Sequence, residues 1–341
     1  MENFLKMRKN NSRKFLITGG SGFIGTNVMD YLIKKNISCI NLDFNPPKKR
    51  AHRAYWTDVD ILDYDKLEST ISNFGPTHII HLAATLGMDH KTLETLDTNI
   101  KGVENIIKIL ESKNDIKRII FTSSLLVCKA GYIPQNDTDF CPPNLYGKSK
   151  ALGEKLVRSA KLKCEWVIVR PTSIWGPWFD YSYKSFFKVI DKNMYMHIGN
   201  NEIQKPASFV GNTAYMLIKI LFENDPKINN STYYLADYPW YSSEVWANTI
   251  QQTLGSKPIK TAPLWILRII AIIGSLIKAI FRFDPPLTLS RLNNMHIGGI
   301  YPIDNIKNVS GTLPHDLNES VYITAKWMYE NNLIKHKPSK I

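Results

Sequence analysis

Two residues with complementary chemistry, Tyr146 and Lys150, lie four positions apart in the segment YGKSKALGEKLVRSA. On a helix this spacing places both side chains on one face. A free tyrosine, with a pKa of about 10, is a poor base at neutral pH, but a nearby positive charge favours its phenolate form. The pair could therefore exchange a proton with a substrate hydroxyl, although Tyr and Lys at this spacing commonly form a plain surface pair.

A glycine-rich segment is the second candidate site. It lies between the apolar run KFLIT and a stretch with apolar residues at helical spacing, and it consists of Gly19, Gly20, Ser21, Gly22, Phe23, Ile24 and Gly25. Between a strand and a helix, such glycines let the backbone approach a pyrophosphate closely. Alone the motif is weak, because ordinary strand-to-helix turns also contain glycine.

Asp43 strengthens that interpretation. It ends the second predicted strand, ISCINLDF, 18 residues after Gly25. A carboxylate there can accept hydrogen bonds from the ribose hydroxyls of a dinucleotide and repel a 2′-phosphate. The sequence therefore favours NAD over NADP, although three basic residues at 48–50 follow closely and weaken this preference.

Alternating strands and helices must position these residues. The apolar runs THIIHLAA, RIIFTSS and CEWVIVRP alternate with amphipathic stretches such as DYDKLESTISNF and TNIKGVENIIKILES, and a short strand is expected near 54–57. This order predicts an α/β fold, a Rossmann-type doubly wound parallel sheet. We expect an NAD-binding Rossmann domain at 12–172 and a smaller α+β region at 173–335 that mainly binds substrate, with some segments returning to the Rossmann core.

The composition narrows the class of protein. The chain has 341 residues, 44% of them hydrophobic, and a net charge of +13 carried mostly by dispersed lysines. Dispersed charge indicates a solvated basic surface, and we expect no nucleic-acid partner. The four cysteines lack the spacing of a zinc site or a disulfide framework, so we expect no metal. The N-terminal residues contain no apolar run long enough for a signal peptide, and we therefore expect a cytoplasmic protein.

One segment, residues 263–283, is the most apolar in the chain. Its longest uncharged run is far shorter than the roughly 20 residues that span a bilayer. On a helix, Arg268, Ser275, Lys278 and Arg282 fall on one narrow arc and leave a broad apolar face. That face packs on its own domain, on another subunit or on a membrane surface, and peripheral membrane contact through 263–283 stays open.

The ordered motifs TGGSGFIG, Asp43, Asp60-Ile61, HLAA, TNIKGVENII, FTSS, YGKSK and RPTSIWGP resemble those of the extended short-chain dehydrogenases/reductases, the NAD-dependent epimerase/dehydratase family. The resemblance covers residues 14–335 and implies NAD as cofactor, a nucleotide-linked sugar as substrate, and a homodimer formed through the helices at 99–110 and 146–159.

By this resemblance Tyr146 is the acid/base, Ser124 hydrogen-bonds the reacting oxygen, and Lys150 holds the nicotinamide ribose and tunes Tyr146. The same resemblance implies further cofactor contacts. These are Asp60 and Ile61 at the adenine, Leu82, Ala83 and Ala84 along the cofactor, Asn99 from the next helix, and Ser123, Pro171 and Ser173 at the nicotinamide.

Three differences from the family's usual residues bear on which activity within the family this chain has. Relatives that dehydrate nucleotide sugars carry an acidic pair where this chain has Leu125-Leu126, so a 4,6-dehydratase is disfavoured. Cys128-Lys129 replaces a common Tyr-Gly, and Asn212 replaces a common Asp. The leading hypothesis is an epimerase acting at a ring carbon, C4, of a nucleotide-linked sugar.

Three alternatives remain. A keto-sugar reductase would use the same residues. The 263–283 helix favours an enzyme like 3β-hydroxysteroid dehydrogenase, which would act on an apolar alcohol. Membrane flotation with that helix intact or deleted would discriminate such an enzyme from a nucleotide-sugar enzyme. An NAD-sensing binding protein is compatible with the fold but disfavoured by the intact Ser124, Tyr146 and Lys150.

Overall fold

The computed structural model describes residues 13–87, 89–179, 182–199, 204, 206–281, 285, 287–296, 298, 299 and 301–341. The chain divides into two compact units. Unit 1 comprises the described residues up to Thr172 together with Thr213–Leu235 and Pro302–Thr312. Unit 2 comprises those of Ser173–Asn212, Ala236–Tyr301 and Leu313–Ile341. Two later segments therefore return to the first unit.

Unit 1 is built on a seven-stranded sheet in the order β10-β6-β5-β4-β1-β2-β3, with every neighbouring pair parallel. The strands are β1 (Phe15–Thr18), β2 (Cys39–Leu42), β3 (Trp56–Thr57), β4 (His78–His81), β5 (Arg118–Thr122), β6 (Glu165–Pro171) and β10 (Ser231–Leu235). The predicted doubly wound Rossmann sheet is confirmed. Its strand order reverses between β1 and β4, and ligands of such sheets bind at the carboxyl ends of the strands at this point.

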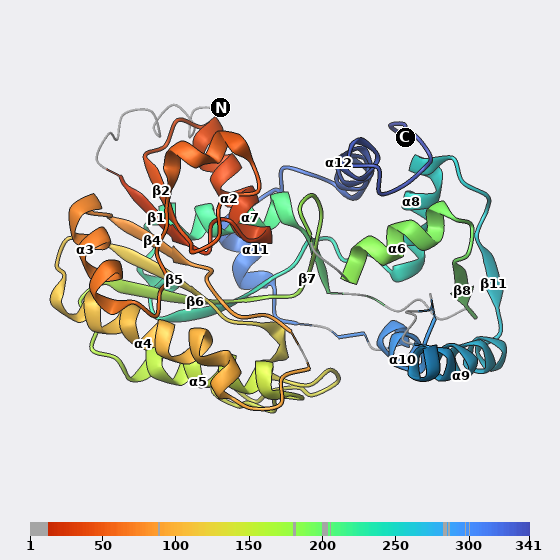
Figure 1. The fold of residues 1–341 in the computed structure, drawn as a ribbon, viewed down its shortest axis with the longest axis horizontal. Helices are drawn as coiled ribbons and strands as arrows, with labels where there is room; N and C mark the ends of the chain where they lie inside the picture. The colour runs from red at the N-terminus through yellow and green to blue at the C-terminus, as the bar shows by residue number, and fades with distance from the viewer. Residues whose placement is uncertain are drawn as a thin grey trace. The chain divides into compact units, whose positions relative to one another are not determined.

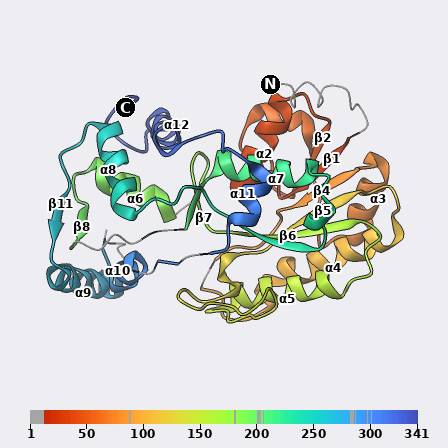
Figure 2. The ribbon, with the colours of Figure 1, turned by 180° about the vertical axis from the view of Figure 1, so that it is seen from behind.

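Helices cover both faces of this sheet (Figures 1 and 2). The α helices of unit 1 are α2 (Phe23–Lys34), α3 (Tyr64–Phe74), α4 (Asp97–Ser112), α5 (Leu145–Ser159), α7 (Val210–Phe222, which begins in unit 2) and α11 (Asp304–Ser310). Apolar residues of α3, α4 and α5 share one buried cluster with the sheet. In the figures, α2, α7 and α11 lie on the other face.

The strand expected near 54–57 is shorter than predicted. Arg50–Tyr55 forms a 3₁₀ helix, and only Trp56–Thr57 pairs with β2. The buried His52 hydrogen-bonds to Asp30 of α2 at 2.8 Å, which holds this segment in a helical turn. Contact with α2 therefore favours a helical turn at 50–55 over the strand that the sequence pattern predicted.

Unit 2 contains two small parallel sheets, β7–β9 and β8–β11, and the helices around them. The strands are β7 (Ser173–Trp175), β8 (Met196–Ile198), β9 (Ala207–Phe209) and β11 (Lys260–Ala262). The helices are α6 (Ser182–Asp191), α8 (Ser243–Leu254), α9 (Leu264–Phe281), α10 (Leu289–His296) and α12 (Leu317–Glu330). In the part of the chain that the structure describes, no helix has the length and apolarity needed to cross a membrane.

Candidate active site

The glycine-rich turn joins β1 to α2 in unit 1. Gly19 has φ +73°, and a Cβ atom at this position would lie 2.6 Å from the backbone nitrogen of Ala83. A Cβ on Gly25 would lie 2.2 Å from the carbonyl oxygen of Gly19. No side chain caps the N-terminus of α2 at Gly22, and the first turn contains no acidic residue. The turn therefore fits a diphosphate, because backbone N–H groups and the helix dipole favour an anion there.

Asp43 follows β2 and faces the same turn. Its carboxylate accepts hydrogen bonds from the backbone N–H of Ser21 at 3.0 Å and of Asn45 at 2.9 Å. Burial raises the pKa of Asp43, opposed by these two hydrogen bonds and by the charge of Lys48. Lys49 instead pairs with Asp30 of α2. One of the basic residues that weakened the preference for NAD is thus engaged by another carboxylate.

Asn99, 1% exposed, connects three segments around the site. Its side-chain oxygen accepts a hydrogen bond from the N–H of Thr85 at 2.8 Å, and its amide donates to the Thr85 carbonyl at 3.0 Å. The same amide donates to the Ser149 hydroxyl of α5 at 2.9 Å. Asn99 therefore fixes the segment after β4, including Leu82 to Ala84, against the helix that carries Tyr146.

Tyr146 and Lys150 lie on α5, as predicted, and Ser124 lies just after β5. Asn144 caps α5 through a 2.8 Å hydrogen bond from the N–H of Gly147. The Ser124 hydroxyl lies close enough to Tyr146 to lower the pKa of its phenol. The ammonium of Lys150, which is 8% exposed, donates to the Thr122 carbonyl at 2.9 Å. The structure thus brings the three predicted catalytic residues together.

Burial dominates the electrostatics of Tyr146 and Lys150. Burial raises the pKa of Tyr146 to about 12, against the lowering effect of the nearby Ser124 hydroxyl. Burial lowers the pKa of Lys150 to about 8, and the carboxylate of Glu154 opposes that shift. The expectation that Lys150 and an oxidised nicotinamide together favour the phenolate of Tyr146 concerns the NAD-bound enzyme and stays a prediction.

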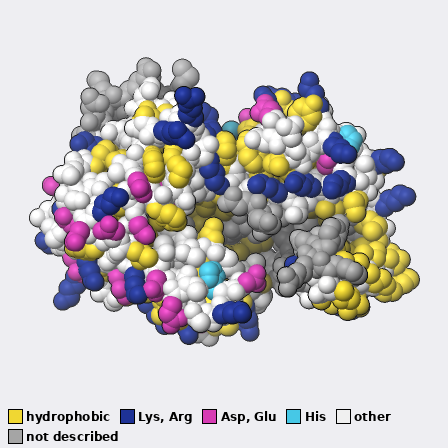
Figure 3. Space-filling view, in the orientation of Figure 1, with side chains coloured by type: hydrophobic (Ala, Val, Ile, Leu, Met, Phe, Trp, Pro, Cys, Tyr) yellow, Lys and Arg dark blue, Asp and Glu magenta, His cyan; other side chains and the backbone are white. Residues whose placement is uncertain are grey.

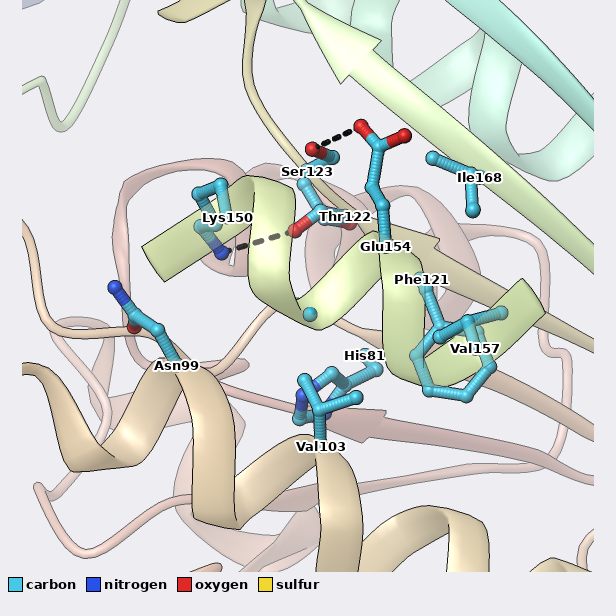
Figure 4. Close-up of a pocket in the computed structure, with 11 residues that line it drawn as sticks. His81, Asn99, Val103, Phe121, Thr122, Ser123, Lys150, Glu154, Val157 and Ile168 are labelled. Carbon is cyan, nitrogen blue, oxygen red and sulfur yellow. Dashed lines mark hydrogen bonds between the residues drawn. The ribbon is translucent and has the colours of Figure 1, made fainter. Parts of the chain in front are cut away.

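Glu154 and Arg170 form a buried ion pair beside the site that the sequence reasoning missed. Glu154 accepts hydrogen bonds from the Arg170 guanidinium at 2.8 and 2.9 Å and from the Ser123 hydroxyl at 2.5 Å. Figure 4 shows Glu154 and Lys150 on the same helix, each bonded to one of the neighbouring residues Ser123 and Thr122. The available signal was spacing, since Glu154 stands four residues after Lys150.

A cavity of about 20 Å³ lies among these side chains (Figure 4). This volume suits about one water molecule and excludes a sugar. The polar residues that line it are His81, Asn99, Thr122, Ser123, Lys150 and Glu154. His81 itself is 3% exposed and hydrogen-bonds to the Thr18 hydroxyl at 2.7 Å. Burial, with a smaller effect of Lys150, lowers its pKa to about 3, so His81 is neutral at physiological pH.

The remaining predicted cofactor contacts lie at the ends of other strands. Asp60 is exposed and accepts a hydrogen bond from the N–H of Leu62, whereas Ile61 is buried. A Cβ atom on Gly102 of α4 would lie 2.3 Å from the side chain of Ile61, so Ile61 packs directly against the backbone of that helix. Pro171 ends β6, and Ser173 begins β7 in unit 2. Among the described residues, no group of three or more His, Cys, Asp or Glu could hold a metal ion.

Comparisons with known proteins agree with this geometry. Residues 15–205, more than half of the chain, match the NAD dependent epimerase/dehydratase family. A 3 beta-hydroxysteroid dehydrogenase/Delta 5→4-isomerase of vaccinia virus is 27% identical over 297 residues, 79% of this chain and 84% of the relative. The N-acetyl-alpha-D-glucosaminyl-diphospho-ditrans,octacis-undecaprenol 4-epimerase of Escherichia coli O157:H7 is 28% identical over 252 residues, 71% of this chain and 72% of that enzyme.

Solved structures match the fold over nearly the whole chain. The UDP-glucose 4-epimerase of Thermus thermophilus in complex with NAD superposes with a TM-score of 0.65 at 18% identity, covering 91% of this chain and 97% of that one. The predicted family, fold and cofactor are confirmed. The chain therefore belongs to the NAD dependent epimerase/dehydratase family, and it is an NAD-dependent enzyme of the extended short-chain dehydrogenase/reductase type.

Proposed function

We propose that the protein is a 4-epimerase of a nucleotide-linked sugar. The observation that carries this proposal is the proximity of Ser124 to Tyr146, with the buried ammonium of Lys150 one helical turn further along α5. Similarity to a 4-epimerase over 71% of the chain supports the choice of C4. Two leucines at 125–126, where dehydratases of the family carry acids, favour epimerisation over dehydration.

Each of the three residues has a role that follows from its environment. NAD supplies a hydride acceptor and a positive charge when it is bound. Tyr146 accepts the proton of the C4 hydroxyl, and Ser124 holds the same oxygen by a hydrogen bond. Lys150 has three N–H donors, of which one reaches Thr122, so it can also bind the ribose hydroxyls of the cofactor. Its positive charge then favours the phenolate of Tyr146.

Further proposed cofactor contacts follow the strand ends. We infer that Gly19 to Gly25 cradle the diphosphate and that Asp43 binds the adenosine ribose. Asp60 and the backbone of the buried Ile61 would contact the adenine. The segment Leu82 to Ala84, held by Asn99, would line the cofactor, with Ser123, Pro171 and Ser173 at the nicotinamide.

A second candidate is oxidation of an apolar alcohol. The viral 3 beta-hydroxysteroid dehydrogenase/isomerase is similar over 79% of the chain, and α9 exposes several large apolar side chains. A keto-sugar reductase would use the same three residues with a dissociable cofactor. An epimerase regenerates its cofactor within one turnover, whereas an alcohol oxidation or a keto-sugar reduction leaves the cofactor changed.

The test begins with protein purified without added cofactor. Denaturing it and analysing the released molecules by mass spectrometry should yield NAD, because an epimerase recycles its cofactor internally. Nucleotide sugars with known C4 configuration are then supplied, and NMR should detect the C4 epimer without net formation of NADH. Empty protein that oxidises a sterol, or that consumes NADH with a keto sugar, would contradict the proposal.

Two further expectations concern the whole molecule. We infer a homodimer formed through α4 and α5, which light scattering of the purified protein would test. We also infer a cytoplasmic location, supported by the four cysteines, all of which are free thiols.

A further inference from the structure

Helix α9 of unit 2 is attached to its own unit by one narrow face. Leu267 and Ala271 are buried in a small cluster with Ala262 and Leu292. A Cβ atom on Gly274 would lie 2.0 Å from the carbonyl oxygen of Leu287, so the helix backbone is held directly against the segment before α10. This face fixes the helix along the surface of unit 2.

The opposite face of α9 is apolar and exposed. At 100° per residue, six large side chains fall within an arc of about 100°. They are Trp265, Ile269, Ile272, Ile273, Leu276 and Ile280, between 46% and 69% exposed. We call these six residues the α9 face. Figure 3 shows hydrophobic side chains gathered where Figure 1 places α9. Singly scattered apolar residues are ordinary on a protein surface, whereas six on one helix face form a contiguous patch, a kind of surface that is often functional.

The charge around the α9 face has one sign. Residues 245–283 contain no Asp or Glu, and their five basic residues are Lys257, Lys260, Arg268, Lys278 and Arg282. Arg268 and Lys278, both exposed, lie on α9 itself outside the apolar arc. Arg268 borders the apolar arc, whereas Lys278 lies on the other side of the helix. An apolar helical face that carries a tryptophan, on a helix whose charges are all basic, is typical of helices that lie in the headgroup region of anionic membranes.

The size of the α9 face argues against a second copy of the chain as its occupant. Eighteen helical residues at about 1.5 Å per residue give a strip of roughly 27 Å by 10 Å, or about 270 Å². A stable protein interface buries about 800 Å² on each partner. A bilayer needs no matching pocket, and its anionic headgroups attract the basic residues of α9.

We propose that the α9 face docks on the surface of an anionic lipid bilayer, with the helix axis parallel to the membrane plane and its six apolar side chains among the lipid headgroups and upper acyl chains. Arg268, at the edge of the apolar arc, contacts the phosphates, and Lys278, on the other side of the helix, adds to the positive field that attracts an anionic surface. The inference concerns unit 2 alone. Membrane binding is also expected of the alternative enzyme that oxidises an apolar alcohol, so the reaction itself is decided by the cofactor and C4 epimer assays above and not by vesicle flotation.

Vesicle flotation of the full chain tests this. The wild type should float with vesicles of phosphatidylcholine and phosphatidylglycerol, and much less with phosphatidylcholine alone. The double variant Ile273→Asp/Leu276→Asp should bind the mixed vesicles at least about tenfold more weakly, because two apolar side chains leave the contact and two negative charges enter it. Arg268→Gln/Lys278→Gln should reduce the preference for anionic vesicles.

The matched control is Ile133→Asp/Val245→Asp, which changes two other exposed apolar residues, 87% and 48% exposed. It should float as the wild type does. Thermal unfolding should be the same for all variants, since every changed side chain is exposed. A wild type that ignores both vesicle types, or an Ile273→Asp/Leu276→Asp variant that floats equally well, overturns the proposal. A wild-type dimer that this variant converts to monomer, without lipid binding, would assign the α9 face to a second copy.

Discussion

Replacing Glu154 by glutamine should destabilise unit 1 strongly. The carboxylate is 3% exposed, and its partner Arg170 is fully buried with its guanidinium bonded to Glu154 at 2.8 and 2.9 Å. Glutamine keeps the shape but removes the charge, so the guanidinium stays buried without a counter-ion. Breaking a buried ion pair from one side costs about 3–5 kcal/mol. For a unit of this size that lowers the Tm by about 6–20 °C.

Differential scanning calorimetry measures this effect. The matched control is Glu68→Gln on α3, a glutamate with a side chain 37% exposed that also accepts hydrogen bonds from a basic residue, Lys113, and a hydroxyl, Ser72. Its Tm should stay close to that of the wild type, because water replaces both partners. Equal Tm values for the two variants would refute the reasoning. The same Glu154→Gln change removes the carboxylate that opposes the low pKa of Lys150, about 8. The alkaline limb of activity should then move to lower pH.

Two other predictions concern carboxylates. Asp43→Asn should reduce the ratio of the NADP dissociation constant to the NAD dissociation constant by at least about tenfold, since a charged acceptor of the ribose hydroxyls is worth about 1.5 kcal/mol or more. Fluorescence titration measures both constants, with Asp58→Asn as the control. An unchanged ratio would contradict this prediction. Burial raises the pKa of Asp237 to about 7, above its unfolded value of about 4, despite hydrogen bonds from Phe209, Asn212 and Ser208. Its contribution to stability is therefore complete below pH ~4 and is lost as pH rises to about 7. Relative to Asp237→Asn, the wild-type Tm should fall across this window, and parallel curves would be inconsistent with the shift.

Patterns local in sequence predicted much of the fold and of the candidate site. The spacing of Tyr146 and Lys150 gave their common helix, and the order of apolar runs gave the parallel sheet, because both depend on backbone periodicity. Asn99 was expected to support the site from its helix. Its hydrogen bonds to Thr85 and Ser149 join α4 to the segment after β4 and to α5, and its role toward the cofactor stays a prediction.

Long-range packing could not be predicted in the same way. The ion pair between Glu154 and Arg170 joins α5 to β6, and the burial that makes it strong exists only in the folded sheet. The same burial raises the pKa of Tyr146, an effect that spacing alone could not predict. The apolar residues at 263–283 predicted a helix, but only tertiary contacts decide that Leu267 is buried and Ile273 exposed.

We propose that Tyr146 removes a proton from the substrate hydroxyl during oxidation at C4. The direct measurement is the absorbance of reduced nicotinamide when the NAD-loaded enzyme is mixed with a nucleotide sugar in a single turnover. The wild type should form a transient NADH signal that decays as the epimer appears. Tyr146→Phe should bind NAD as well as the wild type does, but it should form NADH at least about a hundredfold more slowly. This factor is at the lower end of what a general acid–base group contributes. A Tyr146→Phe variant that reduces NAD at the wild-type rate would contradict the account.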